Sequence, residues 1–212
     1  MSLPIIVLGA GGHARVLIDA LRSRAAIIRG VVDADNDKHA QMLFDIPIIG
    51  DDQAVLDIPA DSVGLVNGIG TVRVSLQRRQ IFDDFKRKGY CFATVIHASA
   101  IVAADVLLGE GAQIMAGAVL QTGCQIGENT IINTRVAVDH DCIIGNHVHV
   151  SPGATLCGNV TVGDGAHIGA GATVIQGIRI GRNGMVAAGA LVIRDIADDV
   201  TVAGVPAREM LG

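Results

Sequence analysis

Residues 126–144 read IGENTIINTRVAVDHDCII, and within them an aliphatic residue returns at every sixth position: Ile126, Ile132, Val138 and Ile144. An α-helix would repeat near 3.6 residues and an extended strand near 2, so a period of six fits neither. It is typical of a solenoid in which short straight segments alternate with corners. We call this series of aliphatic residues the six-residue ladder. It continues without interruption in both directions, through Ile96, Val102, Leu108, Ile114, Leu120, Val150, Leu156, Val162, Ile168, Val174, Ile180, Val186 and Val192.

A second period of eighteen residues lies on top of the first. A glycine follows the aliphatic residue at Gly109, Gly127, Gly145, Gly163 and Gly181. One coil therefore has three sides of six residues, and glycine marks one corner because it tolerates unusual backbone angles. The position two before most aliphatic residues is small, which suits the narrow interior of a triangular coil. The sequence predicts an all-β solenoid of parallel strands.

The composition changes near residue 93. All four Phe, the only Tyr and all three Lys precede residue 96. We therefore expect a first domain at 1–92 and the solenoid at 93–197. The next position of the ladder would be Asp198, so residues 198–212 are expected to form a C-terminal cap or tail.

The first ninety residues alternate between predicted strands and helices. Apolar runs at 4–8, 27–32 and 63–66 read as buried strands, and the helix after the first strand is expected to bury Val16, Leu17, Ala20 and Leu21. This alternation predicts a small Rossmann-like α/β domain with a parallel sheet.

A glycine motif lies between the first strand and the first helix. Gly9-x-Gly11-x-x-Ala14, with Asp33 after the second strand, resembles a dinucleotide fingerprint. The glycines could instead only turn a tight corner. Ninety residues are half of a full dinucleotide-binding domain, so we expect a site for a nucleotide or nucleotide-linked ligand rather than a hydride-transfer enzyme.

The solenoid carries one concentrated group of polar residues, the run Asp139-His140-Asp141. A carboxylate beside an imidazole fixes its tautomer and raises its basicity, as a general base near neutral pH requires. Three more imidazoles follow within two coils, at His147, His149 and His167. Zinc accepts these ligand types, so a zinc-dependent hydratase like the gamma-type carbonic anhydrases is an alternative. The five-residue histidine spacing of those enzymes is absent here, because Arg135 and Gly145 flank His140 at that distance.

The sequence resembles the hexapeptide-repeat sugar acyltransferases, which include the bacillosamine-pathway and perosamine N-acetyltransferases and the sialic acid O-acetyltransferases. The resemblance covers nearly the whole chain and rests on the motifs at 9–15 (GAGGHAR), 131–134 (IINT), 138–145 (VDHDCIIG) and 204–208 (GVPAR). It implies a left-handed parallel β-helix, an exception to the usual right-handed crossover, assembled as a homotrimer with sites between subunits.

The resemblance also implies roles for individual residues. His140 is similar to the catalytic base of the family, Asp141 to its supporting carboxylate, and Asn133 to a polar residue near the reacting amine. Two further sets are similar to binding positions: Gly11, Gly12, His13, Asp33 and Gly70 to the sugar-nucleotide site, and His149, Ala170 and Ala188 to the acetyl-CoA groove.

The expected function is acetyl transfer from acetyl-CoA, as co-substrate, to the amine of a nucleotide-linked 4-amino-4,6-dideoxy sugar for a cell-surface polysaccharide. Three alternatives stay open: O-acetylation of sialic acid or another sugar hydroxyl, an acyl-enzyme on Cys142, and a non-catalytic nucleotide-sugar sensor. The sequence does not distinguish which nucleotide (UDP, GDP, dTDP or CMP) carries the sugar, which sugar is the acceptor, or which acyl group is transferred. No metal is expected.

The overall composition bears on the binding partners and the cellular location of the protein. A net charge of −5 without a basic run argues against nucleic acid. No stretch approaches the ~18–20 apolar residues that span a bilayer, and residues 4–9 lack the basic leader of a secretory signal. We expect a cytoplasmic protein whose four cysteines are reduced, with Cys124 and Cys142 stacked as core residues one coil apart.

Overall fold

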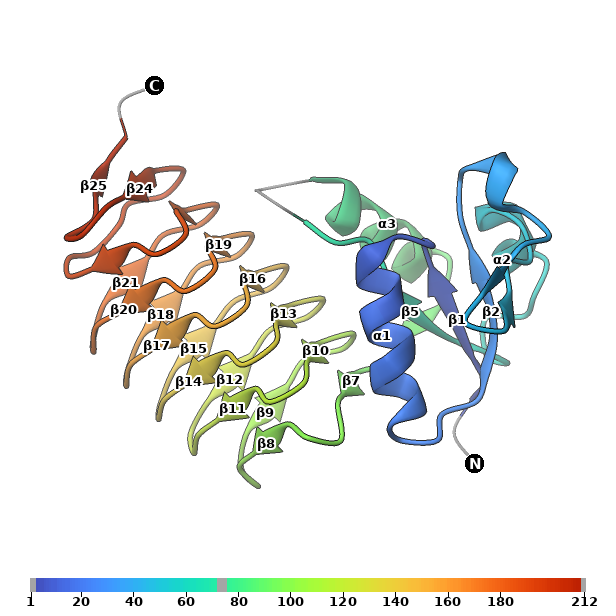
Figure 1. Cartoon of the computed structure of the whole chain (residues 1–212), viewed down its shortest axis with the longest axis horizontal. Helices are drawn as coiled ribbons and strands as arrows, with labels where there is room; N and C mark the ends of the chain where they lie inside the picture. Colours follow the sequence, from blue (N-terminus) through green and yellow to red (C-terminus); the bar gives the residue numbers. More distant parts are fainter. Residues whose placement is uncertain (1–2, 72–75, 211–212) are drawn as a thin grey trace. The chain divides into compact units, whose positions relative to one another are not determined.

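The structure, a computed structural model, describes residues 3–71 and 76–210. It divides into two compact units, Met1–Ala98 and Ser99–Gly212, which Figure 1 shows as an α/β unit and a stack of coils. The boundary between the two units falls after residue 98, a few residues beyond the change of composition near residue 93.

The first unit is built on a parallel sheet with the strand order β2-β1-β5-β6. The elements in chain order up to residue 96 are β1 (Ile5–Leu8), α1 (Gly12–Arg22), β2 (Ile28–Val32), a 3₁₀ turn (Asn36–Lys38), β3 (Met42–Leu43), β4 (Ile46–Pro47), α2 (Asp52–Leu56), β5 (Gly64–Asn67), α3 (Leu76–Arg87), β6 (Cys91–Phe92) and β7 (Val95–Ile96); β7 is not a strand of the four-stranded sheet. The Rossmann-like parallel sheet expected from the sequence is confirmed.

The expected buried face of α1 needs one correction. Val16 is 42% exposed, whereas Ile18 is fully buried. Leu17, Ala20 and Leu21 are buried as expected, and Ala14 and Ile18 are buried with them. Positions 14, 17, 18 and 21 share one side of the helix, because they follow the spacing i, i+3, i+4 and i+7.

The second unit is a parallel β-helix whose coils repeat every eighteen residues, as the register of Ile131 with His149 shows. The strands from β8 to β23 have two residues each. One stack contains β8 (Ile101–Val102), β11 (Val119–Leu120), β14 (Ala137–Val138), β17 (Thr155–Leu156), β20 (Thr173–Val174) and β23 (Leu191–Val192). The second contains β9 (Leu107–Leu108), β12 (Gln125–Ile126), β15 (Ile143–Ile144), β18 (Thr161–Val162) and β21 (Arg179–Ile180). The third contains β10 (Gln113–Ile114), β13 (Ile131–Ile132), β16 (His149–Val150), β19 (His167–Ile168), β22 (Met185–Val186), β24 (Thr201–Ala203) and β25 (Arg208–Glu209).

The six-residue ladder forms the core of the β-helix. From Ile114 to Val192 every aliphatic residue of the ladder is buried, and the small residues two positions earlier are buried beside them, including Ala112, Ala154 and Ala172. Cys124 and Cys142 are fully buried free thiols, as expected for core residues.

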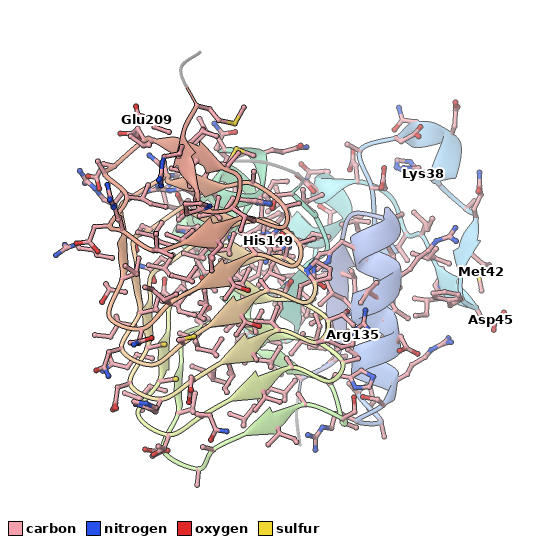
Figure 2. The ribbon with its side chains drawn as sticks, turned by 60° about the vertical axis from the view of Figure 1, so that its left-hand side comes forward. Lys38, Met42, Asp45, Arg135, His149 and Glu209 are labelled. Atoms are coloured by element: carbon pink, nitrogen blue, oxygen red, sulfur yellow. The ribbon has the colours of Figure 1, made fainter. Side chains whose placement is uncertain are left out.

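The coils continue past residue 197. Ile196 bridges to Ile180, and β24 pairs in parallel with β22, so Thr201–Ala203 is the next strand of the third stack. The chain then reverses, and β25 pairs antiparallel with β24. Glu209 marks this final hairpin in Figure 2. The ladder misses this coil because its spacing departs from eighteen residues: Met185 pairs with Thr201, sixteen positions later.

Candidate active site

The corner that follows β14 holds the His140–Asp141 pair. The imidazole Nδ1 lies 2.8 Å from Oδ2 of Asp141, and the backbone amide of His140 donates to Oδ1 of Asp139 at 2.8 Å. Both side chains are accessible, with exposed fractions of 49% for His140 and 59% for Asp141. An ionised carboxylate only accepts hydrogen bonds, so Nδ1 carries the proton and Nε2 keeps its lone pair.

The environment makes His140 a stronger base. The hydrogen bond to Asp141 raises the pKa of the imidazole above its ordinary 6.5, and the charge of Asp139 acts in the same direction. Asp141 has a φ of +58°, in the left-handed region that Asp tolerates better than most residues. The sharp turn directs the carboxylate of Asp141 back to the ring of its own neighbour. The corner therefore combines an accessible imidazole with a fixed tautomer, which is what a proton-accepting group needs.

A second group of polar residues lies along the third stack. The amide nitrogen of Asn133 is 3.0 Å from Nε2 of His149, and Oγ of Ser151 is 3.2 Å from Nε2 of His167. The two imidazole rings meet edge to face, with centroids 5.0 Å apart, and the register places the two histidines side by side. Both are buried, and burial lowers the pKa of His167. His149 lies within the stack of coils in Figure 2. An amide nitrogen only donates, so Nε2 of His149 is the acceptor in its contact with Asn133, and the row is a set of buried, oriented polar groups.

The two alanines expected near the acyl donor occupy consecutive corners. Ala170 and Ala188 are exposed and one coil apart, and the Gly189 amide donates to the Ala170 carbonyl at 2.9 Å. A Cβ on Gly169 would lie only 2.4 Å from the Ala188 nitrogen, so the coils pack closely there. The structure thus places both alanines in one column of small residues, whereas His149 lies on a strand.

The residues expected to bind a nucleotide converge at the carboxyl end of the parallel sheet. Gly11 is the N-cap of α1 and Gly12 its first residue, and a Cβ on Gly70 would lie 3.0 Å from Cβ of His13. Asp33 joins them from the end of β2, because its Oδ2 accepts the Ala10 amide at 2.7 Å. The sequence-based grouping of these five residues is therefore reproduced in space, although they come from three segments of the chain.

Asp33 is engaged within the protein. Oδ1 accepts the Asp35 amide at 3.0 Å and an ion pair from Lys38 at 3.1 Å. Burial alone would raise the pKa of Asp33, but these contacts and the Ala10 hydrogen bond outweigh it and lower the pKa. The carboxylate thus fixes the glycine loop, and Lys38 is a cation at this edge that the sequence analysis missed.

Arg78 is a second residue that the sequence analysis missed. It is 4% exposed, and its Nη1 donates to the carbonyls of Asn67 and Ile69 at 2.7 and 2.8 Å. The Asn67 side chain in turn donates to the Arg78 carbonyl at 2.9 Å. Burial lowers the Arg78 pKa to about 9. This pair fixes the loop that leads to Gly70. A charged residue on an otherwise ordinary amphipathic helix gave no signal that it would be buried.

Cys142 is poorly suited to carry an acyl group. It is fully buried, its Sγ donates to the Cys157 carbonyl at 3.2 Å, and burial raises its pKa to about 12. The thiolate is the nucleophilic form of cysteine, and at neutral pH almost none is present. Within residues 3–71 and 76–210, no group of three His, Cys, Asp or Glu side chains is arranged to hold a metal ion. In the same described segments, no helix has the length and apolar character needed to cross a membrane.

A parallel α/β sheet and a hexapeptide β-helix in one chain are the two parts found in the hexapeptide-repeat sugar acyltransferases. Residues 4–91 match the model of the PglD N-terminal domain, and residues 105–140 and 123–158 match the bacterial transferase hexapeptide repeat. The chain belongs to this acyltransferase family and is an acetyltransferase with a left-handed β-helix.

Several solved structures are similar over nearly the whole chain. A variant of perosamine N-acetyltransferase from Caulobacter crescentus, in complex with CoA and GDP-perosamine, is 36% identical with a TM-score of 0.91, covering 99% of this chain and 97% of that one. The acetyltransferase domain of PglB from Neisseria gonorrhoeae, in complex with acetyl coenzyme A, is 32% identical with a TM-score of 0.90, covering 99% and 100%. WeeI from Acinetobacter baumannii is 26% identical with a TM-score of 0.87, covering 99% and 100%. A comparison with curated protein sequences gives no match.

Proposed function

We propose that this acetyltransferase transfers the acetyl group of acetyl-CoA to the amine of a nucleotide-linked 4-amino-4,6-dideoxy sugar. The observation that carries the proposal is the 2.8 Å contact between His140 Nδ1 and Asp141, which leaves Nε2 to accept a proton. The donor and acceptor classes are supported by relatives solved with acetyl coenzyme A and with GDP-perosamine. A GDP-linked sugar is the first acceptor to test.

The proposed chemistry is a direct transfer. The neutral sugar amine attacks the thioester carbonyl, and a C–N bond forms while His140 Nε2 takes a proton from the amine nitrogen. The C–S bond then breaks and CoA leaves as the thiolate, so no acyl-enzyme forms. A backbone amide stabilises the oxyanion of the tetrahedral intermediate. Asp141 stabilises the imidazolium formed in this step.

The remaining expected residues fit binding roles. We infer that the loops around Gly11, His13 and Gly70 hold the nucleotide, with Lys38 as a nearby cation. We infer further that Asn133 and His149 lie near the reacting groups and that Ala170 and Ala188 make room for the acyl donor. In this proposal the protein acts as a homotrimer in the cytoplasm, with each site between two subunits.

The substrate assignment is tested by following CoA release from acetyl-CoA with a panel of UDP-, GDP-, dTDP- and CMP-linked sugars. Each 4-amino sugar is paired with the matching 4-hydroxy sugar. We expect turnover with an amino sugar and none with its hydroxyl partner. Turnover with hydroxyl acceptors alone would replace this proposal with O-acetylation. Activity that falls on chelation and returns with zinc would favour the metal-dependent alternative.

The base is tested separately with His140→Ala. General base catalysis contributes typically ~10²- to 10⁴-fold, so turnover should fall by that order. Because the His140 side chain is half exposed, the fold should be retained, which circular dichroism and size-exclusion chromatography would check. Near-normal turnover in a folded variant would remove His140 from the mechanism.

A further inference from the structure

One corner column of the β-helix contains a glycine that its backbone does not require. The column holds one residue per coil, and its members are Ala104, Thr122, His140, Gly158 and Gln176. The φ of Gly158 lies outside the left-handed region that favours glycine. Four coils carry a side chain at this corner position, so the local geometry accepts one. The absence of a side chain at Gly158 therefore needs another cause.

The cause lies one coil earlier, in the imidazole of His140. A Cβ on Gly158 would lie 2.5 Å from Nε2, 2.6 Å from Cε1 and 3.1 Å from Cδ2 of that ring. Real Cβ contacts essentially never fall below 3.0 Å. The ring thus occupies the space that any side chain at residue 158 would fill. The Asp141 carboxylate holds Nδ1, and the bare Cα of Gly158 leaves room for Nε2.

A related contact exists for the carboxylate. A Cβ on Gly123 would lie 2.4 Å from Oδ1 of Asp141. Gly123, however, has a φ of +76°, so its backbone gives a second reason for glycine. Gly158 has only the steric reason, which makes it the sharper test.

We propose that Gly158 is a positioning residue that sets where Nε2 of His140 lies for proton transfer, by leaving open the space that the ring occupies. This inference rests on the proposed role of His140 as the base. Because the ring is an accessible side chain, a methyl group at residue 158 displaces it rather than unfolding the coil. Gly158→Ala therefore alters the reaction more than the stability.

The test is a double-mutant cycle with Gly158→Ala, His140→Ala and the variant with both changes. A displacement near 1 Å can cost about 10²-fold in rate, so Gly158→Ala should lower kcat by roughly 10- to 100-fold, with KM for both substrates nearly unchanged. In the His140→Ala background the same substitution should have no effect, because the ring it displaces is absent. A full loss in both backgrounds, or no loss in the wild-type background, would overturn the proposal. If His140→Ala itself keeps its activity, the proposed base fails instead.

Two measurements separate positioning from general damage. Gly177→Ala adds a methyl group at the neighbouring corner position, where a Cβ would meet nothing within 4 Å; its φ of +71° adds backbone strain but no contact with the His140 ring, so this variant should keep its kcat even if its stability falls. The second measurement is the His140 pKa from NMR titration, since Asp141 and Asp139 on its own corner are the charged groups that raise it. Thr122 and Gly158 on the adjacent coils contribute none. In Gly158→Ala the pKa should fall toward its ordinary value, and an unchanged pKa would contradict a displaced ring.

Discussion

The backbone amide of Ala10 donates a hydrogen bond of 2.7 Å to Oδ2 of Asp33, across 23 residues of sequence. This bond connects the loop after β1 to the end of β2. It holds the glycine loop in one conformation before any ligand arrives. A site organised in this way binds with a smaller entropic cost than one that must order its loop on binding.

Asp33→Ala should destabilise the first unit. Hydrogen bonds to charged groups contribute about 1.5–3 kcal/mol each, and a loss of about that size is expected. Urea unfolding followed by fluorescence of Tyr90, the only tyrosine, reports on this unit. Asp61→Ala, at an exposed turn, is the control and should change stability by less than about 0.5 kcal/mol. Equal effects of the two substitutions would show that the Ala10 contact contributes nothing.

The lowered pKa of Asp33 predicts that the free energy of unfolding depends on pH. The pKa of Asp33 is lower in the folded protein than its ordinary 3.8, so the folded state favours the ionised form. Its contribution to stability is therefore complete above pH 3.8 and is lost as the pH falls through the lowered value. Unfolding free energies of the wild type and Asp33→Ala should converge in acid, and a constant difference down to the lowest pH would contradict this.

Asp141→Asn should shift the pH profile of the reaction. The base acts as neutral imidazole, so kcat/KM falls as the pH drops through the raised His140 pKa, above pH 6.5. An amide at residue 141 cannot hold the imidazolium, so the acidic limb should move to lower pH. The plateau rate should fall as well, because the tautomer is no longer fixed. An acidic limb at the same pH in both proteins would show that Asp141 does not set this pKa.

Cys142→Ala should keep turnover within about twofold of the wild type, because a buried thiol with a pKa of about 12 supplies no thiolate at neutral pH. Under native conditions a thiol reagent should modify the exposed Cys91 first. Cys91→Ala should remove that rapid phase of labelling. A folded Cys142→Ala protein without activity would revive the acyl-enzyme route.

Ile143 and Ile144 are neighbours on β15 with opposite orientations, 48% and 2% exposed. Ile144→Ala leaves a cavity in the narrow core and should cost about 2–5 kcal/mol. Ile143→Ala removes a half-exposed side chain and should cost about 1 kcal/mol or less. Chemical unfolding followed by far-ultraviolet circular dichroism compares them, and similar losses would mean that the outer face is buried in the assembled protein.

The six-residue ladder was sufficient to predict the β-helix because its aliphatic residues, from Ile114 to Val192, have the same buried environment in successive coils. Local periodicity could not place Val16, because several rotations of a short helix bury similar apolar surface. It also could not reveal Arg78 as buried, since that depends on carbonyl groups elsewhere in the unit. The His140–Asp141 contact was predictable from adjacency in the sequence. The contact of His140 with Gly158 was not, because it depends on the rotamer of one side chain and the spacing of two coils.

The register of the stack, in which residue 131 faces residue 149, restricts how this molecule can change length. An insertion or deletion of one whole coil downstream of Gly158 would preserve the direction of every later side chain. A change of one residue within a strand would exchange inward and outward positions for the rest of that stack. We therefore expect natural and engineered variants to tolerate changes of eighteen residues more readily than changes of one.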